Sequence, residues 1–212
     1  MSDFLVDVLY LIAGGLLLPV LLVLFAFMAG TLLGLGGLAR EALERRATAA
    51  IWRRFLAELR AGTVDPDEFY KLPLAGYVRR FCQETARIQE SPLVLKKCLD
   101  DLEIDVACRL ARLSLATRVG PMLGLVGTLL PLGPALTGLA AGRVEVLAGN
   151  LIIAFTTTVF GILIGGFAYA MGLVRRAWYE QDLCDLEFLV AMKEAAQGPN
   201  AAALLSEEPD LA

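Results

Sequence analysis

The fold of this chain is decided by two long apolar stretches, RVGPMLGLVGTLLPLGPALTGLAAG at residues 118–142 and NLIIAFTTTVFGILIGGFAYAMGLVRR at residues 150–176. Each exceeds the roughly 20 residues that an α-helix needs to cross the hydrocarbon core of a bilayer. The short connection between them carries only two charged side chains, Arg143 and Glu145. The sequence therefore predicts a transmembrane hairpin over residues 118–176.

Small residues recur at helical spacing along both stretches and so share one face of each helix. Lipid tails are as apolar as leucine, so helices in a bilayer associate by close backbone approach over small residues. We therefore expect both helices to pack tightly, and we expect a homo-oligomer, because one subunit cannot bury all of these faces alone. The predicted packing residues are Gly120, Gly124, Gly127, Gly161 and Gly165.

Prolines and threonines add a second pattern to the hairpin. Pro121, Pro131 and Pro134 lack the backbone N–H that a helix interior uses, so kinks are expected in the first stretch. Hydroxyl groups fall at membrane depth at Thr128, Thr157 and Thr158. They either support helix packing or line a polar path, and periodicity alone leaves both possibilities open.

Two motifs in the hairpin carry a resemblance to a known family. The run Pro121-Met-Leu-Gly-Leu-Val-Gly-Thr128 resembles the P-x-L-G-x-x-G-T signature of the MotA/TolQ/ExbB proton channel family. The run Thr157-Thr-Val-Phe-Gly161 is similar to the T-x-x-G element of that family's last transmembrane helix. The motifs occur in the expected order on consecutive spans, and the layout of three spans resembles the TolQ/ExbB pattern.

The resemblance implies a function and a set of partners. Subunits of this family form a ring of five around the single transmembrane helices of two ExbD/TolR/MotB-like partners, each of which carries one essential Asp. By this resemblance, Thr128 and Thr158 would line the ring and face the partner carboxylate, and ion flow would drive rotation of the ring. The chain would then be the pore-ring subunit of an ion-driven motor that performs work on an outer process such as protein transport.

The first span and the orientation follow from the remaining apolar and basic residues. Residues 4–38 are apolar apart from Asp7 and form one more predicted span. Basic residues follow the first span, precede the second and follow the third, so the N-terminus is expected outside and the C-terminus in the cytoplasm. The expected location is the inner (cytoplasmic) membrane. The residues that set this orientation are Arg40, Arg45, Arg46, Arg112, Arg118, Arg175 and Arg176.

The predicted fold is all-α, with three transmembrane helices, two of them extended into the cytoplasm. Its parts are the outer N-terminus and first span at 1–39, a helical cytoplasmic domain at 40–117, the hairpin at 118–176, and a C-terminal helix with a disordered tail at 177–212. Between the spans, helices are predicted from Leu38 to Arg60 and at 74–89, with a short one after Asp65-Pro66 and a long one from Ser91-Pro92 onward. Gly62 suits the left-handed cap of the first of these helices.

Composition excludes several classes of function. The chain has 212 residues, 57% of them hydrophobic, a formal net charge of −4 and no histidine, so it offers neither a basic surface for nucleic acid nor the commonest general base and metal ligand. We expect no enzyme activity, no metal site and no cofactor. The acidic run Asp100, Asp101, Glu103 and Asp105 and the basic pair Arg79-Arg80 are interpreted as solvated faces. Four cysteines are interpreted as small buried packing residues: Cys82, Cys98, Cys108 and Cys184.

Alternatives stay open at this stage. No Asp, Glu, Lys, Arg or His lies between residues 120 and 142 or between 147 and 174, so a titratable group for ion transfer must come from a partner. The coupling ion is expected to be a proton, with Na⁺ as the alternative because the Thr156–Thr158 run supplies extra oxygens. A flagellar-stator-like subunit, a non-conducting membrane scaffold and a small-solute carrier are the other readings. The carrier fits poorly because the chain lacks repeats.

Overall fold

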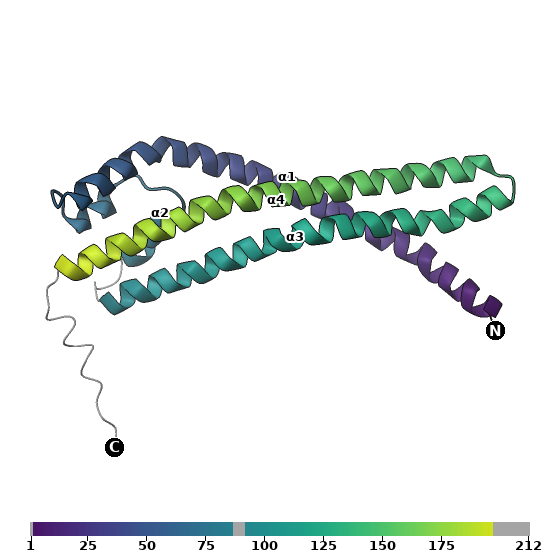
Figure 1. Ribbon diagram of the computed structural model, residues 1–212, viewed down its shortest axis with the longest axis horizontal. Helices are drawn as coiled ribbons and strands as arrows, with labels where there is room; N and C mark the ends of the chain where they lie inside the picture. The colour runs from purple at the N-terminus through teal and green to yellow at the C-terminus, as the bar shows by residue number, and fades with distance from the viewer. Residues whose placement is uncertain (1, 87–91, 197–212) are drawn as a thin grey trace, which may run out of the picture. The chain divides into compact units, whose positions relative to one another are not determined.

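The computed structural model describes the backbone of residues 2–86 and 92–196, and every regular element in this part is helical (Figure 1). The elements are α1 (Ser2–Arg60), the 3-10 helix η1 (Pro66–Lys71), α2 (Gly76–Thr85), α3 (Pro92–Ala140) and α4 (Val144–Ala196). Stretches long and apolar enough to cross a membrane occur in α1, α3 and α4. The predicted all-α class with three spans is confirmed. The predicted disordered tail lies outside the described residues.

The three long helices run without interruption from their apolar into their polar segments. The helix expected from Leu38 is the continuation of α1, which has 59 residues and contains Pro19. Likewise α3 continues through Pro121, Pro131 and Pro134 to Ala140. A proline removes only one N–H donor, and neighbouring helices can compensate for its loss in an apolar environment. None of these prolines therefore ends a helix.

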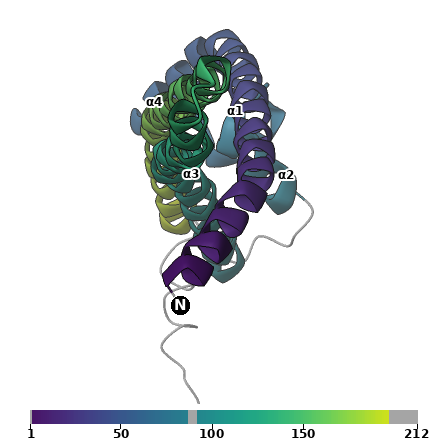
Figure 2. The same ribbon diagram turned by 90° about the vertical axis from the view of Figure 1, so that its right-hand side faces the viewer.

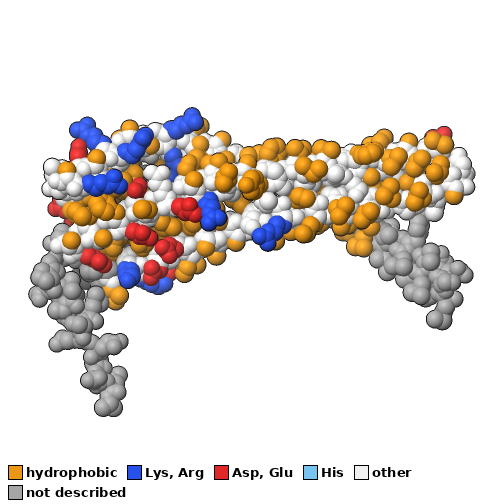
Figure 3. Space-filling model, in the orientation of Figure 1, with side chains coloured by type: hydrophobic (Ala, Val, Ile, Leu, Met, Phe, Trp, Pro, Cys, Tyr) orange, Lys and Arg blue, Asp and Glu red, His pale blue; other side chains and the backbone are white. Residues whose placement is uncertain are grey.

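The chain divides into two compact units, and the divisions fall inside the long helices. One unit, called the apolar unit here, comprises Met1–Gly37 and Leu110–Leu173. The other, called the polar unit, comprises Leu38–Arg109 and Val174–Ala212. Figure 3 shows hydrophobic side chains covering much of the apolar unit, whereas Lys, Arg, Asp and Glu gather on the polar unit.

In the apolar unit, α3 and α4 form an antiparallel hairpin and α1 packs against it (Figures 1 and 2). The hairpin turns at Gly142, which has φ of +73°, a value that glycine tolerates best. On α1, Leu24 is fully buried, and the Phe25 ring lies 5.7 Å from the Phe160 ring in an edge-to-face contact. These contacts fix one stripe of α1, while several of its other large side chains stay exposed, as expected of a helix in lipid.

The polar unit has a compact aromatic and aliphatic core. Its fully buried side chains come from every helical element that the structure places there, and they include Leu59, Phe69, Phe81, Leu102, Leu186 and Leu189. The end of α1 is capped as predicted: Gly62 has φ of +67°, and the Thr63 N–H donates to the Glu58 carbonyl at 3.1 Å. The Asp65 side chain caps η1 by accepting from the Asp67 N–H at 3.0 Å.

Local detail corrects several expectations in the polar unit. The helix expected at 74–89 is α2, which begins at Gly76 and ends at Thr85, while residue 89 lies outside the described residues. Cys82 and Cys98 are half-buried, but Cys108 and Cys184 are exposed, so their interpretation as buried packing residues is wrong. In α3, Cys108 comes two residues after the buried Val106, a step of about 200° that turns it away from the core.

The acidic run on α3 is also more structured than expected. Asp105 accepts hydrogen bonds from the Tyr77 hydroxyl at 3.0 Å and from Arg80 at 2.6 Å, and it pairs with Arg109 at 3.2 Å. Asp105 is half-buried, so its interpretation as part of a solvated face is wrong, whereas Arg80 is exposed, as predicted, although it also pairs with Asp105. Asp100 and Glu103 are exposed, as predicted.

Candidate ion-path surface

The packing of α3 against α4 rests on direct backbone contact between glycines. A methyl group added to Gly161 would lie 2.7 Å from Gly124 Cα and 2.8 Å from the Gly120 carbonyl oxygen. One added to Gly120 would lie 2.8 Å from Ile164 Cγ2. Real Cβ contacts are almost never that short, so these positions bring the two helices as close as backbones can come.

The same interface continues in both directions along the hairpin. A Cβ on Gly127 would lie 2.7 Å from Thr157 Cβ, and one on Gly165 would lie 2.8 Å from Pro121 Cγ. All five predicted packing glycines thus lie in one contact zone within a single chain. The argument that these faces require a second subunit is therefore wrong, because the chain buries them itself. Any oligomer has to use other surfaces.

The prolines of α3 divide between this interface and its edge. Pro131 is fully buried, and Pro121 contacts the Gly165 position of α4. Pro134 is half-buried. Each of these prolines leaves the carbonyl four residues earlier without its intrahelical donor, a loss that the close packing of the helices has to compensate.

The three predicted threonines occupy two different environments. Thr157 is 2% exposed and packs on Gly127, and its hydroxyl donates to the Ala154 carbonyl at 2.8 Å. Thr128 and Thr158 are partly exposed, and their hydroxyls donate to the carbonyls of Leu125 at 2.6 Å and Ala154 at 3.1 Å. Within one chain, Thr157 therefore faces the hairpin interior, whereas the other two reach its surface.

Helical geometry places Thr128 and Thr158 on the same flank of the hairpin. Each directly follows a member of the facing pair Gly127 and Thr157. One residue is a rotation of about 100°, and in an antiparallel pair the same step along both chains turns both side chains toward the same side. A Cβ on Gly124 would lie 3.5 Å from Thr158 Cα, so Thr158 borders the interface directly.

Large apolar side chains surround these two hydroxyls. Leu125 and Leu132 lie one turn from Thr128 on α3, with 61% and 36% of their surface exposed. Phe155 and Ile162 lie one turn from Thr158 on α4, with 68% and 61% exposed. We call this surface the threonine flank. It is apolar with two hydroxyls, and no Asp, Glu, Lys, Arg or His occurs in the apolar stretches that form it.

Such a surface can supply oxygen atoms to an ion or to a hydrogen-bond donor, but it contains no group that gains or loses a proton near neutral pH. A threonine hydroxyl neither holds nor releases a proton near neutral pH, so the flank alone offers no relay group. Each hydroxyl proton is already donated to a carbonyl of its own helix. What the flank presents is oxygen lone pairs, which accept hydrogen bonds or coordinate a cation.

The polar unit contains a charged cluster that the sequence did not reveal. Arg45 donates to both carboxylate oxygens of Asp182, at 2.8 and 2.6 Å, and Asp182 also accepts from the Tyr77 backbone N–H at 3.2 Å. Glu41 contacts Arg45 and Arg175 at 3.3 and 3.6 Å. Burial alone would lower the pKa of Arg45, but its hydrogen bonds and the charges of Asp182 and Glu41 raise it.

No local signal identifies this cluster, because Arg45 and Asp182 are 137 positions apart. The sequence suggested only that Arg45 helps to set the membrane orientation. The cluster is composed like a structural ion-pair network, because each of its charged groups pairs with another. Within the described residues, no group of three or more His, Cys, Asp or Glu side chains is placed to hold a metal ion.

Comparisons with known proteins give one result that bears on this geometry. The sequence model that describes the MotA/TolQ/ExbB proton channel family matches residues 67–185, more than half of the chain. That match includes all of α3, α4 as far as Asp185, and the whole threonine flank. No curated protein and no solved structure matches the chain. Together, the family match and three membrane-spanning helices identify this chain as a multi-pass membrane protein that belongs to the MotA/TolQ/ExbB proton channel family.

Proposed function

We propose that the chain is the ring-forming subunit of an ion-driven inner-membrane motor. Five copies would surround the single transmembrane helices of a partner dimer of the ExbD/TolR type, and ion-motive force would be converted into mechanical work on an outer process. The observation that carries the proposal is the threonine flank, which offers two hydroxyls in an apolar surface without any carboxylate. The membership in a proton channel family supports an ion-driven function of this kind.

The partner would supply the titratable group. A carboxylate is costly in the bilayer, but its protonated form is neutral and can donate a hydrogen bond. Because the Thr128 and Thr158 hydroxyl protons are used within their own helices, the hydroxyl oxygens are suited to accept that bond. Protonation of the partner's carboxylate would thus let that side chain move along the flank. Its deprotonation on the opposite side of the membrane would complete the transfer of the proton.

Exposed apolar side chains support assembly around such a partner. Large side chains on both hairpin helices, including Met122, Leu129, Ile152 and Val159, are at least half exposed in the single chain. One part of this surface suits lipid, and the rest suits neighbouring subunits. We propose a proton as the coupling ion, ion transport rather than catalysis as the activity, and an orientation with the N-terminus outside and the polar unit in the cytoplasm.

Substitution of Thr158 by valine tests the proposal. Valine keeps the shape and removes the oxygen, so Thr158→Val should assemble normally and lose most of the activity of the complex. Thr156→Val is the matched control: Thr156 is exposed and bonded to the Ile152 carbonyl, but it lies about 160° around the helix from Thr158. The readouts are complementation and proton flux in vesicles, with and without the partner.

Two outcomes would contradict the proposal. Full activity of Thr158→Val, with normal flux, would remove the flank from the ion path and favour a scaffold that does not conduct ions. Rapid flux through the chain without any partner would show that the titratable group is not supplied by another protein. Replacement of protons by Na⁺ in the flux assay separates the two coupling ions.

A further inference from the structure

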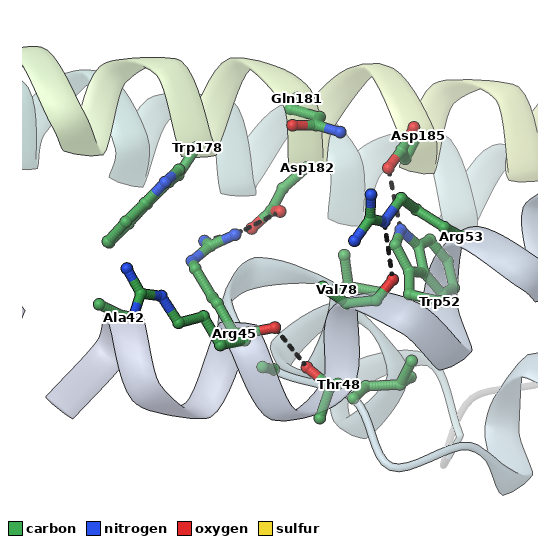
Figure 4. Close-up of a pocket in the computed structure, with 14 residues that line it drawn as sticks. Ala42, Arg45, Thr48, Trp52, Arg53, Val78, Trp178, Gln181, Asp182 and Asp185 are labelled. Atoms are coloured by element: carbon green, nitrogen blue, oxygen red, sulfur yellow. Dashed lines mark hydrogen bonds and ion pairs between the residues drawn. The ribbon is translucent and has the colours of Figure 1, made fainter.

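The polar unit contains an open pocket of about 430 Å³ between α1, α4 and the segment that leads into α2 (Figure 4). Two indole rings and several cationic or polar side chains line it. They include Arg46, Trp52, Arg53, Trp178 and Gln181. All of them belong to the polar unit and none contributes to the threonine flank.

The carboxylates of this pocket are already engaged. Asp182 is held by Arg45 through a pair of hydrogen bonds, and Asp185 accepts from the Trp52 indole N–H at 2.9 Å (Figure 4). Arg45 in turn lies over the Trp178 ring, with its guanidinium carbon 5.2 Å from the ring centre. The acidic side chains therefore offer little to a cationic ligand.

The remaining arginines have unused donors. Arg46 is exposed and makes no hydrogen bond or ion pair with any described residue, and Arg53 donates only from Nε to the Ala49 carbonyl at 3.2 Å. A guanidinium has five N–H donors arranged to bind the oxygens of a phosphate. The N–H donors that remain unused in the pocket therefore suit an anion, and aromatic rings lie beside them.

Position along the helices narrows the class of anion. On α1, Arg46 follows Leu38, the last residue of the predicted span, by eight residues, or about 12 Å of helix. On α4, Trp178 follows Val174 by about one turn. Both helices leave the apolar stretch in the N-to-C direction, and helical side chains tilt toward the N-terminus, so both side chains lean back toward the span. Tryptophan and arginine in this position are typical of the lipid headgroup layer.

We propose that Arg46 and the Trp178 ring bind the phosphate headgroup of an anionic phospholipid at the membrane end of this pocket. Arg53 lies about 22 Å past Leu38 along α1, beyond the headgroup layer, and takes no part. The proposal goes beyond the motor function and does not depend on it. It gives the polar unit a specific contact with the membrane surface next to its charged cluster.

Tryptophan fluorescence gives a direct test, because the chain has two tryptophans and both line this pocket. Trp52→Phe leaves Trp178 as the reporter. The full chain is reconstituted in phosphatidylcholine vesicles that contain phosphatidylglycerol or phosphatidylcholine with a nitroxide near the glycerol. We expect phosphatidylglycerol to be enriched at Trp178 by roughly five-fold and to quench it correspondingly more. Equal quenching by both lipids would overturn the proposal.

Three arginine variants in this background locate the site. Arg46→Gln should abolish the preference for phosphatidylglycerol. Arg40→Gln is the matched control, since it removes the same charge nearer to the span from a side chain that is 84% exposed and outside the pocket. It should keep most of the preference, and so should Arg53→Gln. An equal loss in Arg40→Gln would reduce the effect to general surface charge, and an equal loss in Arg53→Gln would contradict the placement of the site at the membrane end of the pocket.

A second measurement avoids the tryptophan substitution. Native mass spectrometry of the otherwise unmodified chain, released from mixed phosphatidylcholine and phosphatidylglycerol nanodiscs, counts the lipids that stay bound. We expect retained phosphatidylglycerol, and its loss in Arg46→Gln. Retention of the same amount in Arg46→Gln would overturn the assignment of the headgroup to this arginine.

Discussion

Neighbouring glycines of α4 differ sharply in the space around them. A Cβ on Gly161 would lie 2.7 Å from Gly124 Cα, whereas nothing lies within 4 Å of a Cβ on Gly166. We predict that Gly161→Ala lowers the free energy of unfolding by about 1–3 kcal/mol, because the helices must separate to admit the methyl group. Gly166→Ala should be neutral, or stabilising by up to about 1 kcal/mol through helix propensity. Thermal unfolding in detergent, followed by circular dichroism, should separate the two variants, and equal melting temperatures would contradict this packing.

Asp105 predicts a pH-dependent contribution to stability. Burial alone would raise its pKa, but the hydrogen bond from Tyr77 and the charges of Arg109 and Arg80 outweigh burial and lower the pKa below its ordinary value of 3.8. A carboxyl whose pKa is lower in the folded state stabilises the fold above the unfolded pKa, and this contribution is lost as the pH falls through the folded pKa. Asp105→Asn should therefore cost about 1 kcal/mol at neutral pH, a small value because the side chain is one third exposed.

Measured against pH, the stability difference between Asp105→Asn and the unmodified chain should shrink below pH 4 and vanish in stronger acid. Asp100→Asn provides the control, since Asp100 lies on the same helix and is exposed. It should change the free energy of unfolding by less than about 0.5 kcal/mol at any pH. A difference for Asp105→Asn that persists unchanged in acid would show that the carboxylate charge is not the cause.

At the scale of elements, the pair Arg45–Asp182 connects α1 to α4 and to the start of α2. Their side chains are 17% and 9% exposed. Asp182→Asn should destabilise the polar unit by about 3 kcal/mol, because a largely buried guanidinium then loses the carboxylate that it binds with both oxygens. Adding Arg45→Met should recover part of that loss, since no unpaired charge then remains. Arg54→Gln, which removes an exposed pair with Glu58, should cost less than about 0.5 kcal/mol in the same thermal assay. Equal losses in Asp182→Asn and Arg54→Gln would contradict this role.

Elements were predictable from the sequence where local rules determine them. Gly62 and Asp65 mark the end of α1 and the start of η1 because capping needs only a few neighbouring residues. The hairpin and its close-packed glycines follow from length and period in the same way. The Arg45–Asp182 pair could not be predicted, because its two residues come together only after three helices have packed. For the same reason, the sequence could not separate the buried Thr157 from the partly exposed Thr158.

At the scale of the whole molecule, the glycine contacts lie within one chain and the threonine flank is left uncovered. We predict that native mass spectrometry of the detergent-extracted protein shows a homo-oligomer, with a pentamer as the main species. Gly161→Ala should lower the melting temperature without changing the number of subunits, because its contact does not join subunits. A monomer as the only species would contradict the proposed ring, and dissociation of Gly161→Ala into monomers would place the glycine contact between subunits.

The exposed cysteines allow site-specific labelling of this protein for distance measurements. Cys108 on α3 and Cys184 on α4 are solvent-accessible, whereas Cys82 and Cys98 are half-buried and burial raises the pKa of both thiols. The thiolate is the nucleophile that adds to the double bond of a maleimide, so a short reaction near neutral pH should modify Cys108 and Cys184 several-fold faster than the other two, as peptide mass spectrometry can verify. The unmodified sequence thus provides two attachment points for spin labels or fluorophores on separate helices. Distances between them could be followed with and without an ion gradient, without engineering a single cysteine.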